Sequence, residues 1–131
     1  TNFAFAAVKG DGSVLTWGDP RSGGDSSTVQ EELQGDVLQI YSTSFAFAAV
    51  RGNGAVVTWG AASEGGDSSA VREELQGDVQ QIYSTSAAFA AVKANGAVVT
   101  WGHGSRGGVG GAAGGYGRRG VGGEAVNCNL R

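Results

Sequence analysis

The sequence predicts an all-β protein made of tandem repeats, and three observations support that prediction. Residues 3–44 align without gaps on residues 45–86 with 31 of 42 positions identical, and residues 87–102 begin a third copy with 13 of 16 positions matching. Each copy holds two short runs rich in β-branched and aromatic residues. An Asp-Gly or Asn-Gly pair separates the two runs in every copy. A fixed period of this kind is typical of repeat architectures.

The first part of each repeat is expected to be a β-hairpin. In the first copy, residues 3–8 and 14–17 would be its strands. Asp-Gly and Asn-Gly favour a two-residue turn, because both central positions of that turn need positive φ. The three turns are therefore expected at Asp11 and Gly12, Asn53 and Gly54, and Asn95 and Gly96.

A two-residue turn also predicts which side chains share a face. It places Val8 opposite Leu15 and Ala6 opposite Trp17, and partners across a ladder point the same way. The same face in all three copies is expected to form the structural core, with these members: Trp17, Trp59, Trp101, Val8, Val50, Val92, Ala6, Ala48 and Ala90. Because the middle repeat has neighbours on both sides, we expect Trp59 to be the most buried tryptophan. Aromatic residues in such periodic positions are more often packing residues than a lectin-like recognition surface.

The second part of each repeat is expected to hold a short helix and a third strand. Val29 and Leu33 lie four residues apart and would make a narrow apolar stripe on a helix of about two turns. Asp25, Ser26 or Ser27 could cap that helix, and Ser27 with Gln30 fits a capping box. Residues 36–42 then read as a strand in which Val37, Gln39 and Tyr41 alternate with Leu38, Ile40 and Ser42.

Composition divides the chain into two parts and excludes several functions. The net charge of −3 combines a balance of −6 over residues 1–102 with +3 over residues 103–131. The acidic repeats offer no clustered cations for duplex nucleic acid. No apolar run is long enough to cross a bilayer. We therefore expect a repeat domain over residues 1–102 and a flexible tail over residues 103–131. Of the 30 residues from Gly102 to Arg131, 12 are glycine.

Groups that could carry catalysis or hold a metal are scarce. The single histidine, His103, and the single cysteine, Cys128, both fall in the glycine-rich tail. They cannot supply the four ligands of a zinc site, and one cysteine allows no internal disulfide. Acidic residues recur in each repeat and could bind calcium, but their spacing fits no EF-hand loop, and a solvated acidic face explains them equally well. We expect no catalytic residue, no metal and no cofactor.

The order of motifs in the repeat resembles that of the RCC1-type repeat, the blade of a β-propeller family named after a chromatin-bound exchange factor. The matching pieces are Ala49-Val-Arg-Gly-Asn-Gly54, Val56-Val-Thr-Trp59-Gly60, Val71, Leu75 and Val79-Gln-Gln-Ile82. Gly65-Gly-Asp-Ser68 stands where the family has Gly-Gln-Leu-Gly, and Thr43-x-x-Ala46 replaces its Gly-x-x-His. The resemblance covers residues 3–102 and implies blade-like units. Two and a fraction repeats cannot close a seven-bladed ring, so a partial propeller or a short stacked array is expected.

These observations lead to a non-enzymatic structural or protein-interaction module, with its open repeat ends buried against protein partners. Exchange activity on a GTPase is not carried over from the resembled family, because the closed ring is missing. One alternative is an accessory peripheral subunit of a larger assembly, and similar repeats in predicted proteins of photosynthetic microalgae suggest a plastid complex. Another is RNA binding through the tail, where Arg106, Tyr116, Arg118 and Arg119 lie among glycines. The sequence does not identify the partner, the compartment or the oligomeric state.

Overall fold

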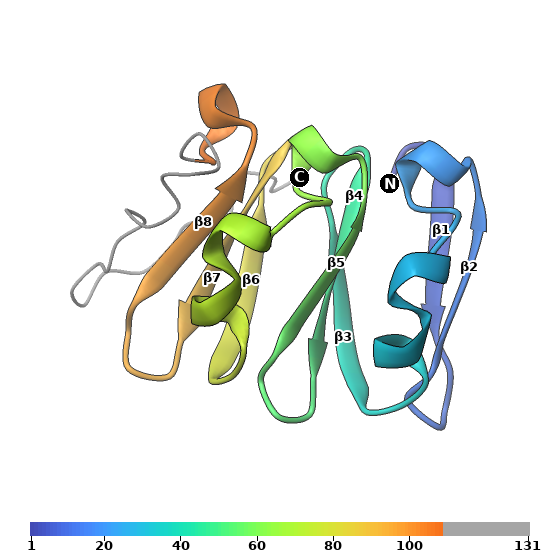
Figure 1. Cartoon of the computed structure of the whole chain (residues 1–131), viewed down its shortest axis with the longest axis horizontal. Coiled ribbons are helices and arrows are strands. Elements are labelled where there is room, and N and C mark those ends of the chain that lie inside the picture. Colours follow the sequence, from blue (N-terminus) through green and yellow to red (C-terminus); the bar gives the residue numbers. More distant parts are fainter. Residues whose placement is uncertain (109–131) are drawn as a thin grey trace.

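The protein consists of three antiparallel β-sheets that stand side by side along the longest axis of the molecule (Figure 1). The computed structural model describes residues 1–108. Strands and short 3-10 helices make up all the regular structure of this part of the chain. The predicted all-β fold of tandem repeats with a short helical segment in each is therefore confirmed.

Each sheet follows the repeat. Sheet 1 is the hairpin of β1 (Ala4–Val8) and β2 (Val14–Gly18). Sheet 2 has the order β3 (Val37–Ser42), β4 (Ala46–Arg51) and β5 (Val56–Gly60), and sheet 3 has the order β6 (Val79–Ser84), β7 (Ala88–Lys93) and β8 (Val98–Gly102). The strand predicted over residues 36–42 is thus present as β3. It is the outer strand of sheet 2, not an extension of sheet 1.

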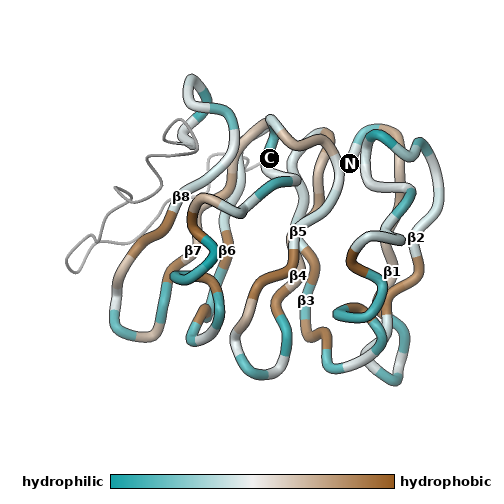
Figure 2. Tube along the Cα trace, in the orientation of Figure 1, coloured by the Kyte–Doolittle hydropathy of each residue, from teal (hydrophilic) through white to brown (hydrophobic). Residues whose placement is uncertain are grey.

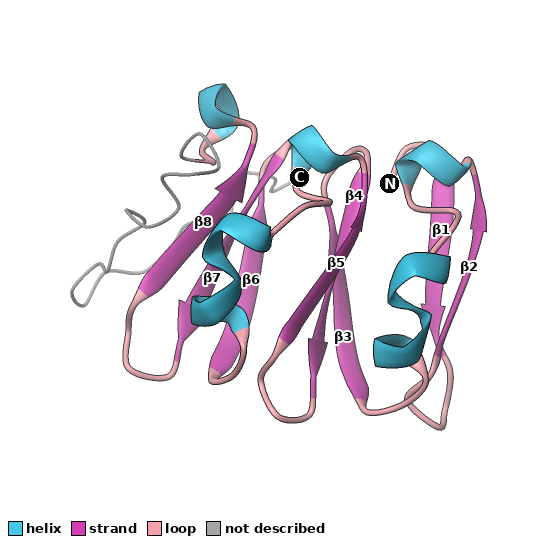
Figure 3. Ribbon diagram, viewed as in Figure 1, coloured by secondary structure: helices cyan, strands magenta, loops and turns pink. Residues whose placement is uncertain are grey.

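Five 3-10 helices connect the sheets (Figure 3). A three-residue turn of helix follows each hairpin: η1 (Pro20–Ser22), η3 (Ala62–Glu64) and η5 (Gly104–Arg106). Longer segments, η2 (Ser27–Leu33) and η4 (Ser69–Leu75), lie between neighbouring sheets. Because η5 repeats the geometry of η1 and η3, the repeat continues beyond the boundary expected at residue 102. The rest of the predicted tail lies outside the described residues.

The hairpin turns contain three residues, so the predicted register is wrong by one position. Lys9 N–H donates to the Ser13 carbonyl at 2.8 Å, which leaves Gly10, Asp11 and Gly12 as the loop. Only Gly12 has positive φ, at 83°, and the Asp11 carboxylate accepts from Ser13 N–H at 2.9 Å. A three-residue loop needs one left-handed glycine, whereas the expected turn needs two left-handed positions. The carboxylate therefore favours the longer loop by holding Asp11 in place.

This one-residue shift moves every tryptophan to the other face of its hairpin. Trp17 lies opposite Phe5, not opposite Ala6, and Val8 lies opposite Val14. The same register recurs in sheets 2 and 3, where Trp59 pairs with Phe47 and Trp101 with Phe89. The three Phe–Trp pairs are stacked, with ring centroids 5.2 or 5.3 Å apart.

The core consists of two layers, one between sheets 1 and 2 and the other between sheets 2 and 3. Figure 2 shows the hydrophobic segments in the strands and the hydrophilic ones in the hairpin turns. The first layer contains Ala4, Leu33, Val37, Phe47, Ala49, Val57 and Trp59. The second contains Ala46, Ala48, Val50, Val71, Leu75, Val79, Ile82, Phe89, Ala91, Val99 and Trp101. The middle strand of sheet 2, β4, therefore contributes alternate residues to the two layers.

The segment predicted as a capped helix is a kinked 3-10 helix with different stabilising bonds. Val29 has non-helical φ and ψ angles, and Ser26, at the N-cap, makes no capping bond. Its hydroxyl instead lies 2.9 Å from the Thr16 hydroxyl on β2. The Asp25 carboxylate accepts from Ser27 N–H at 2.9 Å, so no capping box forms. A hydrogen bond to the strand thus takes the place of the helical cap, and Leu33, near the end of the segment, is buried.

The outer strand of sheet 2 departs from simple alternation because of a β-bulge. The register shifts between Val37 and Gln39. Val37 is buried and Ile40 packs against the same core layer, while Leu38 is exposed. The extra residue at the bulge changes the side to which the following side chains point. The expected grouping of Val37 with Gln39 and Tyr41 is therefore wrong.

Candidate functional site

Each internal contact between repeats includes a stacked Phe–Trp pair that packs on a glycine of the preceding repeat. The Trp59 indole N–H donates to the Gly23 carbonyl at 3.1 Å. A Cβ added to Gly23, whose φ is 101°, would lie 2.5 Å from the Phe47 ring. Trp101, Gly65 and Phe89 repeat this arrangement, with an N–H to carbonyl distance of 3.1 Å. The glycine is thus required both for its backbone conformation and for the close approach of the ring.

Sheet 1 carries the same aromatic pair, but no described residue covers it. Phe5 is 63 % exposed, Leu15 56 % and Trp17 48 %. Neighbouring strand partners place all three on one side of the hairpin. No acceptor for the Trp17 indole N–H lies among residues 1–108. We call this surface, formed by Phe5, Leu15 and Trp17, the open aromatic face.

The edge of β1 beside this face is also free of strand partners within the described residues. In sheets 2 and 3 the corresponding edges pair with β3 and β6. Lys9 N–H points to the β2 side, where it donates to the carbonyl of Ser13, the residue just before β2. By the alternation of an antiparallel ladder, Ala6 and Val8 turn their backbone groups toward the free edge. The N-terminal end of the array thus offers an apolar face and unpaired backbone together.

The structure places the expected core residues in different environments. Trp59, Trp101, Val50 and Ala48 are buried, whereas Ala6, Ala90 and Val92 are half-buried. Trp17 and Val8 are exposed and do not belong to the core. Trp101 is 1 % and Trp59 3 % exposed, so the middle tryptophan is not the most buried. Trp59 and Trp101 pack on the preceding repeat, whereas no repeat precedes Trp17 among the described residues.

The expected turn residues do lie in the hairpin loops, but the residues of the contact were missed. Phe5, Phe47 and Phe89 occupy one repeat position, and Gly23, Gly65 and Gly107 occupy another. The sequence does contain a signal for this contact, because a glycine and a phenylalanine are retained at these two positions in all three copies. The predicted register assigned the phenylalanines to the wrong side of the sheet and hid their relation to the tryptophans.

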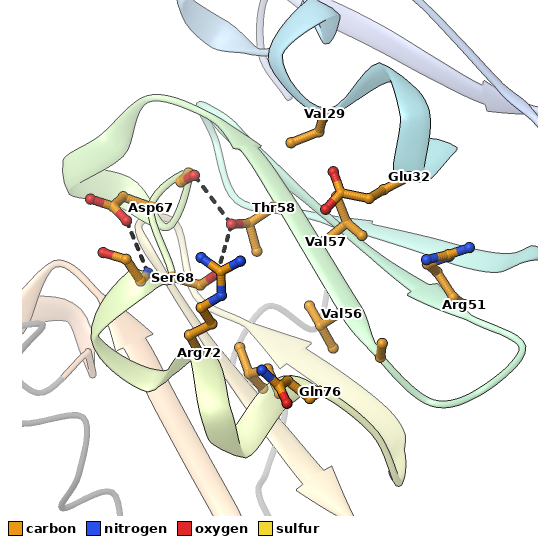
Figure 4. Close-up of a pocket in the computed structure, with 14 residues that line it drawn as sticks. Val29, Glu32, Arg51, Val56, Val57, Thr58, Asp67, Ser68, Arg72 and Gln76 are labelled. Atoms are coloured by element: carbon orange, nitrogen blue, oxygen red, sulfur yellow. Dashed lines mark hydrogen bonds between the residues drawn. The ribbon is translucent and has the colours of Figure 1, made fainter. Parts of the chain in front are cut away.

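A second candidate site is an open groove of about 510 Å³ over β5, between η2 and η4 (Figure 4). Val56 and Val57 contribute apolar surface to it. In Figure 4, Glu32 and Arg51 lie toward the right of the groove, and Arg72 lies on η4 left of its centre. The only ion pair within 4 Å in residues 1–108 is between Arg21 and Asp19, so these three charges are not paired with one another.

The polar groups of this groove serve the fold. The Thr58 hydroxyl donates to the Gly66 carbonyl at 3.2 Å and lies 2.9 Å from the Ser68 hydroxyl. The Asp67 carboxylate accepts from Ser69 N–H at 2.9 Å, and this bond lowers the pKa of Asp67 below its ordinary value. Arg51 has a buried Nε without an acceptor, but the charges around it are of mixed sign. Nothing in the groove converges on a single ligand or reacting atom.

His103 bonds to its neighbour Ser105 at the start of a helical turn. Its Nδ1 lies 2.9 Å from the Ser105 hydroxyl and accepts from Ser105 N–H at 3.3 Å, at the start of η5. Asp19 holds the equivalent position before η1, where it accepts from Arg21 N–H at 2.9 Å. The imidazole therefore caps a helical turn. Across residues 1–108, no three His, Cys, Asp or Glu side chains gather as metal ligands. No helix in that range is long and apolar enough to cross a membrane.

The geometry defines a class of protein: a short array of antiparallel sheets, the first with two strands and the next two with three strands each. Its fold is similar to part of a solved structure, that of human WBSCR16, an RCC1-like β-propeller protein. The similarity covers 82 % of this chain and 34 % of that chain, at 21 % sequence identity and a TM-score of 0.52. The chain thus spans about one third of the length of that relative. No protein-family model matches the sequence, and no curated protein matches it.

Proposed function

We propose that this chain is a non-enzymatic protein-interaction module built of RCC1-like repeats, and that its open aromatic face binds protein. The exposed stack of Phe5 and Trp17 is the observation that carries the proposal. The same pair is buried wherever a neighbouring repeat exists. Clustered exposed apolar side chains mark interaction sites, and aromatic residues supply most of the binding energy at such sites.

A binding function fits the chemistry of the described residues better than catalysis does. The groove described above holds charges of both signs, and its Thr58 hydroxyl already bonds to the backbone. The one histidine in this range caps a helical turn. An accessory subunit of a larger assembly would use the same face, so it is a version of this proposal. The residues proposed for RNA binding lie mostly beyond residue 108 and receive no structural support.

Photo-crosslinking from the open aromatic face tests the proposal. Benzoylphenylalanine at position 5 is expected to crosslink protein in an extract of the source, and excess unmodified chain should compete. The matched control places the same group at Leu38, which is equally exposed but lies on β3. Trp17→Ala should abolish the crosslinks from position 5. If positions 5 and 38 give the same products, or if Trp17→Ala changes nothing, the face is not a binding site.

A further inference from the structure

We call the glycine on which each aromatic pair packs, together with its carbonyl, the seat. The opposite end of the array has a third seat, and no described aromatic pair packs on it. Gly107 has φ of 109° and matches Gly23 and Gly65 in the repeat. A Cβ on Gly23 or Gly65 would meet a phenylalanine ring at 2.5 or 2.6 Å. A Cβ on Gly107 would meet only the Thr85 methyl group, at 3.9 Å. The seat has formed on Gly107, and no described residue occupies it.

A small cavity of about 50 Å³ lies beside Gly107, and we call it the C-terminal cavity. Its lining comprises Tyr83, Ser84, Thr85, Ala88, Phe89, Ala90, Arg106 and Gly107. One repeat earlier, Tyr41, Ala46 and Ala48 belong to the core layer that contains the buried Phe89 ring. Those residues correspond by position to Tyr83, Ala88 and Ala90. The C-terminal cavity is therefore the equivalent of a site that an aromatic ring fills between sheets 2 and 3.

We propose that two copies of this chain associate head to tail, with the open aromatic face of one copy seated in the C-terminal cavity of the other. Phe5 would enter the cavity, and the Trp17 indole N–H would donate to the Gly107 carbonyl. This inference rests on the proposed function, because it names the partner of the same face. The occupant is a second copy, since the two ends reproduce both halves of the internal contact.

A backbone hydrogen bond supports the same alignment. Asn2 N–H donates to the Ser44 carbonyl, and Ser44 N–H donates to the Ser86 carbonyl, each at 2.8 Å. These three residues occupy one repeat position. In the head-to-tail arrangement, Ser86 N–H of one copy donates to the Asn2 carbonyl of the next. One alignment of the two copies thus reproduces both the side-chain and the backbone hydrogen bonds of the internal contact.

The contact is expected to be weaker than the internal ones. The Val37 N–H bond to the Gly12 carbonyl has no counterpart, because sheet 1 lacks an outer strand within the described residues. In the sequence, Ala113 and Gly117 replace the buried Val71 and Leu75 of the preceding repeat. Small interfaces of this kind are transient, with dissociation constants of ~100 µM. Because the two surfaces differ, association continues into longer chains or closes into rings.

Sedimentation velocity of the full chain over a range of concentrations tests the proposal, together with two variants. Wild-type chain should form dimers and larger species as concentration rises. Trp17→Ala removes the open aromatic face and should give a monomer. Gly107→Ala should also give a monomer, because its Cβ finds space in the free chain but would strike the incoming ring. If the strained φ of Gly107 perturbs the loop, Ala90→Arg blocks the cavity from β7 instead.

Mixing the two variants distinguishes a head-to-tail contact from any other. Each variant retains one intact end, so the mixture should form a one-to-one dimer and nothing larger. Leu38→Ala is the control and should associate as wild type does. A wild-type chain that stays monomeric at ~1 mM, about ten times the expected dissociation constant, overturns this inference. So does association that survives Trp17→Ala, or a mixture that stays monomeric. Crosslinking of a different protein from position 5 would then leave the proposed function intact.

Discussion

At the scale of single residues, the three tryptophans occupy one repeat position but make different contacts. Trp59 and Trp101 each fill a seat on a glycine of the preceding repeat and donate to its carbonyl. Trp17 has no preceding repeat in the described chain and lies in solvent beside Phe5. The role of each indole is decided by its neighbour, not by its own surrounding sequence.

Substitution of Trp59 and of Trp17 should therefore change stability by very different amounts. Trp59→Ala leaves a cavity between sheets 1 and 2 and should cost roughly 3–5 kcal/mol of the free energy of unfolding. Trp17→Ala removes an exposed side chain and should change that free energy by about 0.5 kcal/mol or less. Urea titration followed by circular dichroism measures both. Equal losses would mean that Trp17 is also a packing residue.

The Asp67 carboxylate should make stability depend on pH in the acid range. Its pKa is lowered because it accepts a hydrogen bond from Ser69 N–H. A lowered folded-state pKa stabilises the protein above the ordinary Asp value of about 3.9. This contribution is lost as pH falls through the lowered value. Asp67→Asn keeps an acceptor, as Asn53 does toward Ala55 N–H. It should retain neutral-pH stability and reduce the loss of the urea midpoint below about pH 4.

At the scale of elements, each hairpin depends on one left-handed glycine and an Asx side chain. Gly54 has φ of 81°, and the Asn53 side chain accepts from Ala55 N–H at 2.9 Å. The loop also reaches the next sheet, because the Gly54 carbonyl accepts from Val79 N–H at 3.0 Å. The turn therefore sets the register of its own strands and anchors the start of β6.

Gly54→Val should cost more than about 1 kcal/mol of the free energy of unfolding. A β-branched residue resists positive φ, and its Cβ would lie 2.5 Å from the Asp78 backbone nitrogen. Gly10→Val is the matched control in the first hairpin. A Cβ on Gly10 meets nothing within 4 Å, and Gly10 has no positive φ. Thermal unfolding of the two variants should separate them, and equal melting temperatures would contradict this account of the turn.

At the scale of the whole molecule, stability is a sum of contacts between nearest neighbours, as in other repeat arrays. Sheet 2 has neighbours on both sides and supplies buried residues to both core layers. Sheet 1 is covered on one side and has a free strand edge. The N-terminal end should accordingly open more readily than the centre.

Hydrogen exchange should show this gradient at equivalent amides. Ala6 and Val8 N–H face the free edge of β1 and should exchange rapidly. Ala48 and Val50 N–H face β3 and should be protected by orders of magnitude. The measurement is made by NMR at low protein concentration, where self-association is absent. Protection of Ala6 and Val8 under those conditions would show that another segment pairs with β1.

The sequence by itself determined the repeat, the hairpins, the third strand and the all-β class, because each depends on local pattern and on a fixed period. It could not determine the register, since two-residue and three-residue loops fit the same Asp-Gly signal and differ only in how Asp11 bonds to Ser13. The one-residue difference in loop length decides which face of the hairpin each tryptophan occupies. The seat on Gly23 and the exposure of Trp17 required the tertiary structure, because they arise where one repeat meets, or lacks, its neighbour.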